Sequence, residues 1–264
     1  MRKKQPSIIF PKPVRADNKH QNEHCYHVAT SQGGKTSAVK QLPRIKATDQ
    51  VLFFDPYGDY TEPFKGKQVE TYNKIGDFYR AAAQARKKST GFKIAFSPDL
   101  PKKADFDNFC GVVWSLGDGK YKKKLHVVLE EVAQFADSAA KADGYFGNLL
   151  SVGRKFGIVV TTLFQRGQEV PKTVLSNSPY KWVGLQERPE DSIYLSKATG
   201  IPVNDIDSLV QYEYIYKMPG HRDKLCKSKT EKIQINLSLK CDKYHNTETL
   251  YTFRYRAFFL LAWI

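Results

Sequence analysis

The sequence lacks the paired cysteines that a zinc site or a disulfide framework would need. Its 264 residues contain 4 cysteines, and none of them stands in a CxxC or CxxH arrangement: Cys25, Cys110, Cys226 and Cys241. Structural zinc sites and small disulfide-stabilised domains both depend on such clustering. Neither is therefore expected, and we predict reduced thiols in a cytoplasmic compartment.

Long apolar segments are also missing. Met1 to Lys4 are followed by Gln5 and Pro6 instead of an apolar stretch, so no secretory signal peptide is expected. The apolar run at 257–264 is far too short to span a bilayer, and we interpret it as a last strand or an assembly contact. These absences predict a protein without a transmembrane segment.

Acidic residues are scarce. The chain has 27 Asp and Glu against 42 Lys and Arg, which gives a formal net charge of +15. Such an excess favours a polyanionic partner, because phosphate contacts dominate nucleic-acid affinity, although a solubilising surface would explain the charge alone about as well. The basic residues are spread along the chain, which predicts a broad basic face rather than a single charged tail.

Short apolar runs alternate with helical stretches through most of the chain. This pattern predicts an α/β fold whose central sheet is mostly parallel and covered on both faces. We expect a polar arm at 1–22, a core at 23–223 and a small β-rich C-terminal appendage at 224–264 that includes a strand at 233–239. The expected core strands are 25–29, 51–54, 92–96, 125–129, 157–163, 181–185 and 213–217; the expected helices begin at 35 and cover 105–116, 136–155 and 189–199.

A phosphate-binding loop is predicted between the first strand and the first helix, where the chain reads Ala-Thr-Ser-Gln-Gly-Gly-Lys-Thr over 29–36. Such a loop wraps phosphate with backbone N–H groups, reaches the β- and γ-phosphates with a lysine and offers a hydroxyl to Mg²⁺. Ala29 replaces the usual first glycine. A glycine-rich turn with a chance Lys-Thr pair is the alternative, which the strand–helix context disfavours. The expected nucleotide contacts are Gln32, Gly33, Gly34, Lys35, Thr36 and Ser37.

Two adjacent acids follow the apolar strand at 125–129. Glu130 and Glu131 stand where a Walker B motif places one acid near the metal and another near the attacking water. Glu130 replaces the commoner Asp, which suits a metal contact through water. Two acids are also ordinary at a helix N-terminus, because the helix dipole favours them there. The phosphate-binding loop upstream makes the Walker B interpretation the stronger one.

Further segments resemble parts of the FtsK–HerA superfamily of DNA-pumping ATPases. Residues 51–60 end in Asp-Pro-Tyr-Gly-Asp-Tyr, which is similar to the segment after the superfamily's phosphate-loop helix. Residues 152–166 resemble its Gly-Arg-Lys segment and the next strand, which ends in a sensor Gln. The acid pair is similar to the HerA version of Walker B, and the stretch with Val170-Pro171-Lys172 is similar to the superfamily's segment after the sensor. The resemblance covers about 24–218.

The resemblance implies a role for each matched residue. Lys35 would bind the β- and γ-phosphates, Glu131 would be the catalytic acid and Gln165 would sense the γ-phosphate. Arg154 would be a finger acting on a neighbour's site, or else pair structurally with an acid; Arg166 is the next candidate for the finger. The expected Mg²⁺ contacts are Thr36, Glu130 and Asp55, and Asp55 would also help to arrange the water.

The resemblance further implies a RecA-like (ASCE) P-loop NTPase core that assembles as a hexameric ring, binds ATP and Mg²⁺, and contacts double-stranded DNA without reading its sequence. So small a chain is most similar to the genome-packaging ATPases of tailless icosahedral viruses, which implies capsid or vertex proteins as partners and a place in the host cytoplasm or at the virion vertex. A cellular or plasmid HerA-like translocase or helicase, and a phage assembly or extrusion ATPase, are the alternatives.

Overall fold

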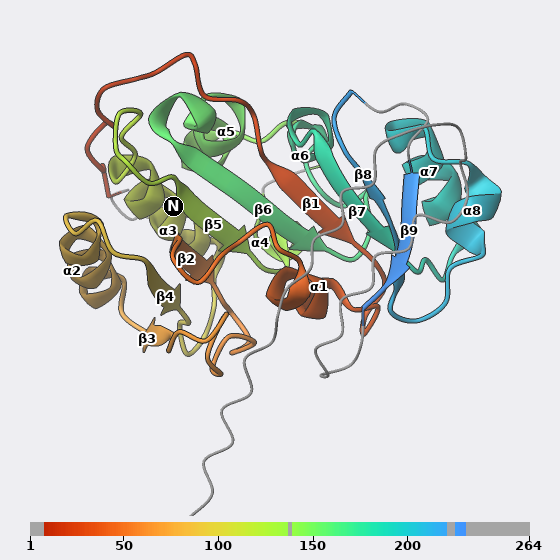
Figure 1. Ribbon diagram of the computed structural model, residues 1–264, viewed down its shortest axis with the longest axis horizontal. Coiled ribbons are helices and arrows are strands. Elements are labelled where there is room, and N and C mark those ends of the chain that lie inside the picture. The colour runs from red at the N-terminus through yellow and green to blue at the C-terminus, as the bar shows by residue number, and fades with distance from the viewer. Residues whose placement is uncertain (1–7, 137–138, 221–224, 231–264) are drawn as a thin grey trace, which may run out of the picture.

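In the computed structural model, residues 8–136, 139–220 and 225–230 are described, and their strands form one nine-stranded sheet in the order β3-β4-β2-β5-β6-β1-β7-β8-β9 (Figure 1). The strands are β1 (Cys25–Val28), β2 (Gln50–Phe54), β3 (Glu70–Tyr72), β4 (Phe92–Phe96), β5 (Leu125–Leu129), β6 (Ile158–Phe164), β7 (Tyr180–Gly184), β8 (Glu213–Lys217) and β9 (Leu225–Lys229). The helices are α1 (Lys35–Gln41), α2 (Ile75–Arg86), α3 (Lys103–Ser115), α4 (Val132–Phe135), α5 (Gly144–Ser151), the 3₁₀ turn η1 (Gly153–Phe156), α6 (Lys172–Asn177), α7 (Pro189–Thr199) and α8 (Val203–Asp207).

The strands from β3 to β7 in this order run parallel to their neighbours, and only β8 and β9 run antiparallel. All the parallel strands therefore end on one side of the sheet, which we call the carboxyl edge, and begin on the other, the amino edge. Strand β6 lies between β1 and β5, so the first strand and the strand before the acid pair are not neighbours.

Helices cover both faces of the sheet, as alternate side chains of β2 demonstrate. Leu52 and Phe54 belong to the larger buried cluster, where the Phe54 ring lies 5.2 Å from that of Phe106 in α3. Val51 and Phe53 point the other way, into a smaller cluster that contains Val39 of α1. Burial on both faces explains why the central strands read as continuous apolar runs.

The helix predicted at 136–155 is wrong in its first part. The structure has the short α4 before it, a loop over 139–143, then α5 and η1. The loop is held by tertiary contacts: the Lys172 N–H donates to the carbonyls of Ala139 and Ala140, and the Ala142 N–H donates to Thr173 Oγ1 at 3.0 Å. These bonds override the helix propensity of the local alanines.

Five elements of the described residues were not predicted, namely β3, α2, α4, α6 and α8, and β9 was covered only by the predicted β-rich appendage. Strand β3 lies at the end of the sheet order and exposes two of its three residues, so it has no apolar run to mark it. The predicted strand at 233–239 and the apolar run at 257–264 lie outside the described residues. None of the helices in 8–136, 139–220 and 225–230 is both long enough and apolar enough to cross a membrane.

Part of the predicted arm packs on the core. Phe10 is buried edge-on against Tyr79 and Tyr145, and its ring occupies the space that a Cβ on Gly111 would need. At the other end of the described chain, β9 pairs with β8 and so extends the main sheet.

Candidate active site

Four loops meet at the carboxyl edge of the sheet. They follow β1, β2, β5 and β6, and they carry the residues predicted for nucleotide chemistry, from the loop at 29–36 to Gln165. Because these strands are parallel neighbours in the order β2-β5-β6-β1, segments distant in sequence are brought together. Ligands of open α/β sheets bind at this edge.

Lys35 folds back over its own loop. Its Nζ donates to the carbonyl oxygens of Ala29 at 2.9 Å and Thr30 at 3.1 Å, and the residue is only 7% exposed. Burial lowers the pKa of Lys35, while Glu131 and Glu130 oppose the shift. Among the residues that the structure describes, no carboxylate lies within hydrogen-bonding distance of the ammonium group, so an anion in the loop could replace the two carbonyls as its partner.

The backbone of this loop needs glycine at particular places. Gly34 has φ of +94°, in the left-handed region that glycine tolerates best, and the exposed Gln32 has φ of +58°. A Cβ on Gly33 would lie 2.7 Å from the Ala29 Cβ, and one on Gly184 would lie 3.0 Å from it. The methyl group of Ala29 therefore occupies space left by two glycines, which explains how this loop accommodates alanine at its first position.

Glu130 is buried beneath two hydroxyl groups. Its Oε1 accepts a hydrogen bond of 2.6 Å from the Tyr60 hydroxyl and one of 3.3 Å from Thr36 Oγ1. Burial raises the pKa of Glu130 to about 8, an effect that the Tyr60 hydrogen bond and Lys35 oppose. A nearby cation would favour the charged carboxylate. Glu130 and Thr36 thus lie within hydrogen-bonding distance of each other, and their contact with Mg²⁺ stays a prediction.

Glu131 faces Gln165. It has φ of +50°, a left-handed conformation that is uncommon outside glycine, and the Gln165 amide nitrogen lies 3.4 and 3.5 Å from its two carboxylate oxygens. Backbone strain of this kind tends to cluster at active sites. Gln165 directly follows β6, which lies between the strand of the phosphate loop and the strand of the acids.

Asp55 shapes the loop after β2. Its two oxygens accept hydrogen bonds from the backbone N–H groups of Asp59 at 2.7 Å and Tyr60 at 3.0 Å. Burial raises the pKa of Asp55, and these bonds oppose the shift. The carboxylate thereby places Tyr60 for its contact with Glu130, a role that sequence reasoning missed even though Tyr60 closes the motif. Contact of Asp55 with a metal stays a prediction.

The oxygen donors around Thr36 suit Mg²⁺. Mg²⁺ prefers oxygen ligands and is usually held by one or two protein groups together with phosphates and water. Thr36 and Glu130 supply such a pair, and Ser37 follows in the first turn of α1. Within 8–136, 139–220 and 225–230, no group of three or more His, Cys, Asp and Glu could hold a metal by itself. The residues fit an ion that arrives with a phosphate ligand.

Arg154 lies away from these residues. It precedes β6 at the amino edge, whereas Gln165 follows β6, so a seven-residue strand of about 23 Å separates them. Its guanidinium donates to the carbonyls of His20 at 2.8 Å and Asn18 at 3.3 Å, rather than to an acid. Arg166 is bound by Asp191 and Glu169. Arg154 is therefore too far away to serve its own site, and its action on a neighbour stays a prediction.

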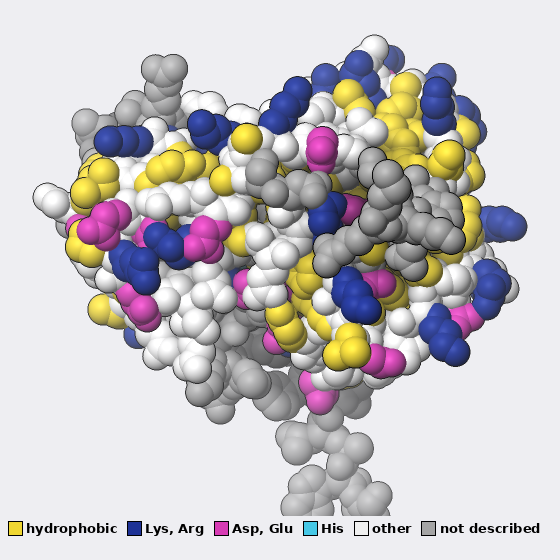
Figure 2. Space-filling model, turned by 180° about the vertical axis from the view of Figure 1, so that it is seen from behind, with side chains coloured by type: hydrophobic (Ala, Val, Ile, Leu, Met, Phe, Trp, Pro, Cys, Tyr) yellow, Lys and Arg dark blue, Asp and Glu magenta, His cyan; other side chains and the backbone are white. Residues whose placement is uncertain are grey.

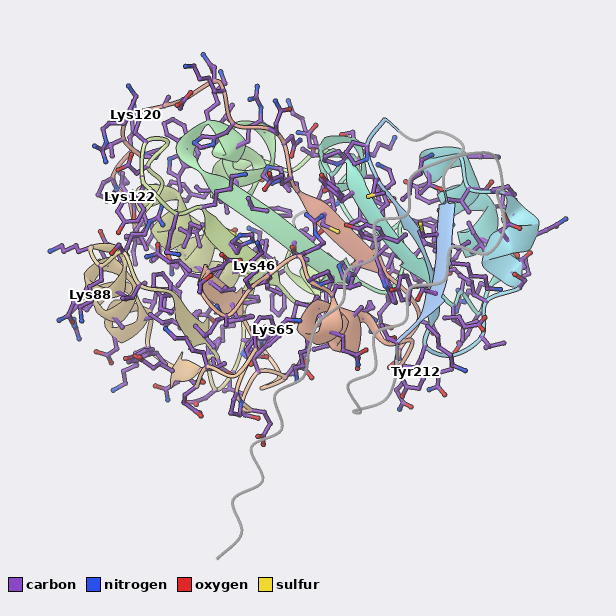
Figure 3. The ribbon with its side chains drawn as sticks, in the orientation of Figure 1. Lys46, Lys65, Lys88, Lys120, Lys122 and Tyr212 are labelled. Carbon is purple, nitrogen blue, oxygen red and sulfur yellow. The ribbon has the colours of Figure 1, made fainter. Side chains whose placement is uncertain are left out.

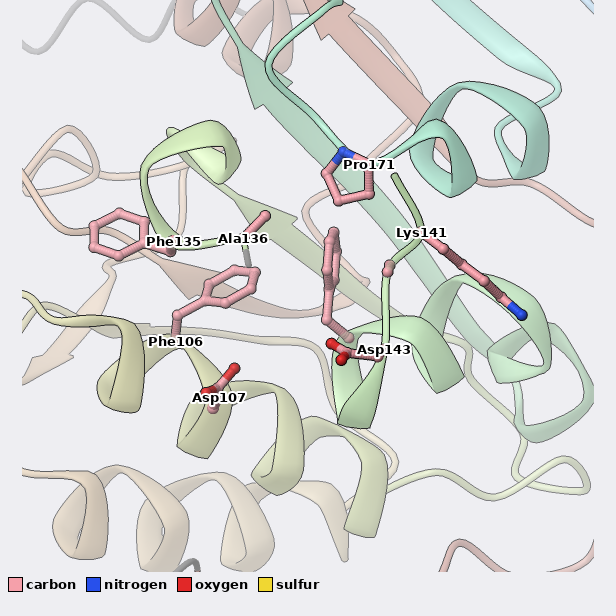
Figure 4. A pocket seen from close by; sticks show the side chains of 9 residues that line it. Phe106, Asp107, Phe135, Ala136, Lys141, Asp143 and Pro171 are labelled. Atoms are coloured by element: carbon pink, nitrogen blue, oxygen red, sulfur yellow. The ribbon is translucent and has the colours of Figure 1, made fainter. Parts of the chain in front are cut away.

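A small hollow near α3 and α5 has no part in this arrangement, since none of the predicted site residues lines it (Figure 4). Both apolar side chains, such as Phe106 and Phe135, and the charged side chains of Asp107, Lys141 and Asp143 line it.

No family model matches the chain. By sequence it is similar to Protein P9 of Pseudoalteromonas phage PM2, at 25% identity over 173 residues, which are 64% of this chain and 72% of that protein.

Solved structures with the same arrangement share little sequence. The genome packaging NTPase B204 of Sulfolobus turreted icosahedral virus 2 has a TM-score of 0.61 at 12% identity, covering 80% of this chain and 98% of its own. The bacterial conjugative coupling protein TrwB has a TM-score of 0.60 at 13% identity, covering 87% and 91%. VirB4 of Thermoanaerobacter pseudethanolicus has a TM-score of 0.59 at 11% identity, covering 86% and 97%. These similarities confirm the predicted fold class, a RecA-like P-loop NTPase core, and the resemblance at the level of the fold.

Proposed function

We propose that this chain is an ATP-hydrolysing motor that moves DNA, and that the DNA is a viral genome being packaged. The observation that carries the proposal is the meeting of Lys35, Thr36, Glu130, Glu131 and Gln165 at one edge of the sheet. The fold shared with a viral genome packaging NTPase, which has been solved with AMPPCP, and the similarity to a phage protein support the choice of substrate.

Each residue at the carboxyl edge has a distinct task in this proposal. Lys35 leaves the carbonyls of Ala29 and Thr30 and binds the β- and γ-phosphates. Thr36 and Glu130 hold Mg²⁺, which when bound neutralises charge on the phosphate oxygens. Glu131 orients the attacking water, and Gln165, in contact with Glu131, senses whether the γ-phosphate is present.

In this proposal, DNA contacts the amino edge of the sheet. Three loops there carry lysines whose side chains form no ion pair with an acid in the described part of the chain. We call these lysines the basic edge: Lys46, Lys87, Lys88, Lys120 and Lys122. All five are exposed. In Figure 3, Lys88, Lys120 and Lys122 lie along one margin of the molecule, and Figure 2 shows basic side chains mostly toward the upper and right-hand rim of the opposite view.

Hydrogen bonds hold the three loops side by side. The Tyr121 hydroxyl donates to the Lys88 carbonyl at 2.9 Å, and the Lys123 ammonium donates to the Thr48 carbonyl at 3.0 Å. The lysines are thus presented on a fixed scaffold. Phosphate contacts of this kind bind DNA without reading its sequence. A ring of copies, the proposed assembly, would repeat this edge around the DNA.

A DNA translocase acting in conjugation is the second candidate, because the TrwB coupling protein has nearly the same TM-score as the packaging NTPase. A capsid gene beside the gene for this chain would favour packaging, and a relaxase gene would favour conjugation.

The test of the activity is DNA-stimulated ATP hydrolysis with two variants. Lys35→Ala should lose both nucleotide binding and turnover. Glu131→Gln should still bind ATP while turnover falls by roughly 10²-fold or more, the usual scale for acid–base groups. Nearly normal turnover by Glu131→Gln would exclude it as the catalytic acid, and hydrolysis indifferent to DNA would favour an assembly ATPase.

The test of the basic edge is the salt dependence of duplex binding. Lys88→Ala/Lys122→Ala should reduce the log–log slope by about 2, since each phosphate contact contributes about 0.9. The matched control is Lys74→Ala/Lys197→Ala, which removes two exposed lysines from other parts of the surface. An equal effect of both double variants would show that only net charge matters.

A further inference from the structure

A second group of residues touches the phosphate loop from the side opposite the acids. It comes from the turn before β8 and from the residue after β9. A Cβ on Gly34 would lie 3.0 Å from Tyr212 Cδ1 and 3.0 Å from Thr230 Oγ1. The Gln211 amide nitrogen donates to the Gln32 carbonyl at 3.3 Å. The phosphate loop is therefore flanked by acids on one side and by an aromatic ring on the other.

The order of the strands indicates which end of a bound nucleotide faces which strands. Glu131 and Gln165 follow β5 and β6, on one side of β1, while β7, β8 and β9 lie on the other side. In the proposed function the γ-phosphate faces Glu131 and Gln165. A nucleoside triphosphate is extended, so its base must lie toward β8 and β9, where Tyr212 stands. In Figure 3, Tyr212 lies on the side of the molecule away from Lys88, Lys120 and Lys122.

Tyr212 is held in an unfavourable backbone conformation. Its φ is +69°, in the left-handed region, where a bulky residue is a genuine outlier. Two bonds fix it there: the Thr230 N–H and hydroxyl both donate to the Tyr212 carbonyl, at 2.7 and 3.1 Å. The residue is only partly buried, between the phosphate loop and the solvent. Strain kept in place by dedicated contacts is characteristic of binding residues.

We propose that Tyr212 is the stacking platform for the base of the bound nucleotide, and that Thr230 is a positioning residue that fixes it. The ligand class is a purine nucleoside triphosphate, whose large π-face gains most from an aromatic platform. The proposal rests on the proposed function, because it takes the direction of the nucleotide from the acids. It links the last described strand of the sheet to nucleotide binding.

The experiment compares ATP with inorganic tripolyphosphate, which has the phosphates but no base. Binding of each is measured by calorimetry with Mg²⁺ present. Tyr212→Asn removes the ring while keeping a residue that tolerates the left-handed backbone, so folding is preserved. ATP should bind this variant about 10-fold or more weakly, the scale of base–aromatic stacking, and tripolyphosphate should bind as it does to the wild type. Tyr212→Phe keeps the ring, so it should bind ATP more tightly than Tyr212→Asn does.

The matched control is Tyr72→Ala, which removes a tyrosine from the edge strand β3 at the far end of the sheet and should change neither affinity. Equal weakening of ATP and tripolyphosphate by Tyr212→Asn would overturn the proposal, because it would mean that the ring only shapes the loop. Unchanged binding of both would overturn it as well. A wild-type chain that binds neither ligand would overturn the proposed function itself, a result distinct from the other two.

Discussion

Glu130 is buried and has two hydroxyl groups as hydrogen-bond partners. Together these features determine when its carboxyl group ionises. With Tyr60 and Thr36 as neighbours, burial raises the pKa to about 8 even though Lys35 is near, so the side chain is mostly protonated at neutral pH while no metal ion is bound. Ionisation of a metal ligand accompanies metal binding, which releases a proton. Tyr60 lessens the cost of that ionisation by donating to the carboxylate.

Tyr60→Phe should therefore lower the affinity of the site for Mg²⁺. Loss of a hydrogen bond to a metal ligand typically costs 10- to 100-fold in metal affinity, so the Mg²⁺ concentration for half-maximal ATP hydrolysis should rise by about that factor. Tyr57→Phe is the control, since the hydroxyl of that exposed tyrosine bonds Gln134 instead. If both variants titrate with Mg²⁺ alike, Tyr60 does not act through Glu130.

The sequence predicted which residues come together at the carboxyl edge better than it predicted their contacts. Lys35, Thr36, Glu130, Glu131 and Gln165 meet because motifs at the ends of parallel strands share one edge. The contacts of Tyr60 and Tyr212 could not be predicted, because they join residues 70 and 178 positions apart through packing that no local pattern encodes. The same is true of Arg154, whose partners belong to the segment before β1.

At the scale of single elements, the phosphate loop depends on space shared with its neighbours. The buried methyl group of Ala29 lies where Gly33 and Gly184 leave room. The conformation of the loop therefore depends on Gly184 at the end of β7, a strand for which no role in the loop was predicted.

Gly33→Ala should lower ATP affinity at least 10-fold, because its Cβ would meet the Ala29 Cβ at 2.7 Å and displace the loop. Adding Ala29→Gly removes that clash and should restore part of the affinity, although a 3.0 Å contact with the Thr30 carbonyl remains. The coupling is measured as a double-mutant cycle of ATP dissociation constants. Strictly additive losses would mean that the two positions act independently.

For the elements as a whole, prediction succeeded where burial on both faces produced an apolar run. Strands β4 and β5 begin and end as predicted, and so do strand β8 and helix α7, which are not buried on both faces. The stretch at 136–155 failed because alanines that favour a helix are held in a loop by Lys172 and Thr173, residues some 30 positions away.

Three histidines, of which His24 and His27 are buried and His126 is 13% exposed, make the stability of the whole molecule depend on pH. Burial lowers the pKa of His24 to about 4, of His27 to about 3 and of His126 to about 4. The folded-state pKa values lie below the usual 6.5, so the unfolded chain binds more protons in acid. The neutral side chains contribute stability above pH 6.5, and it is lost as the pH falls toward 4.

Urea unfolding at pH 7.5 and 5 should show this loss, on the order of 2 kcal/mol for His24 alone between the two. His24→Gln retains an acceptor for the Val160 N–H, which His24 Nδ1 accepts at 3.1 Å, but it cannot titrate. It should therefore flatten the dependence on pH. An unchanged slope in this variant would assign the acid sensitivity to other groups.

The proposed ring is tested by mixing two inactive proteins. Arg154→Ala should bind ATP but hydrolyse it slowly, since fingers that act across an interface contribute on the order of 10³-fold or more. Glu131→Gln lacks the other half of the composite site. An interface that pairs intact Glu131 with the neighbour's intact Arg154 is complete, so a mixture of the two variants should regain activity. If no mixing ratio restores activity although subunit exchange is confirmed, Arg154 does not act on a neighbour's site. Its role is then limited to its hydrogen bonds with the carbonyls of His20 and Asn18.

The central position of β1 has a consequence for the order of events during synthesis. Its described partners are β6 and β7, and 130 residues separate Val28 from Ile158. At about 5–20 residues per second, a ribosome needs roughly 6 to 26 s to supply the first partner after β1 has emerged. During that time the strand that bears the phosphate loop is present but unpaired. Such non-local pairing also slows folding. The nascent chain can thus complete its site for nucleotide only after β6 and the Gln165 that follows it have been made.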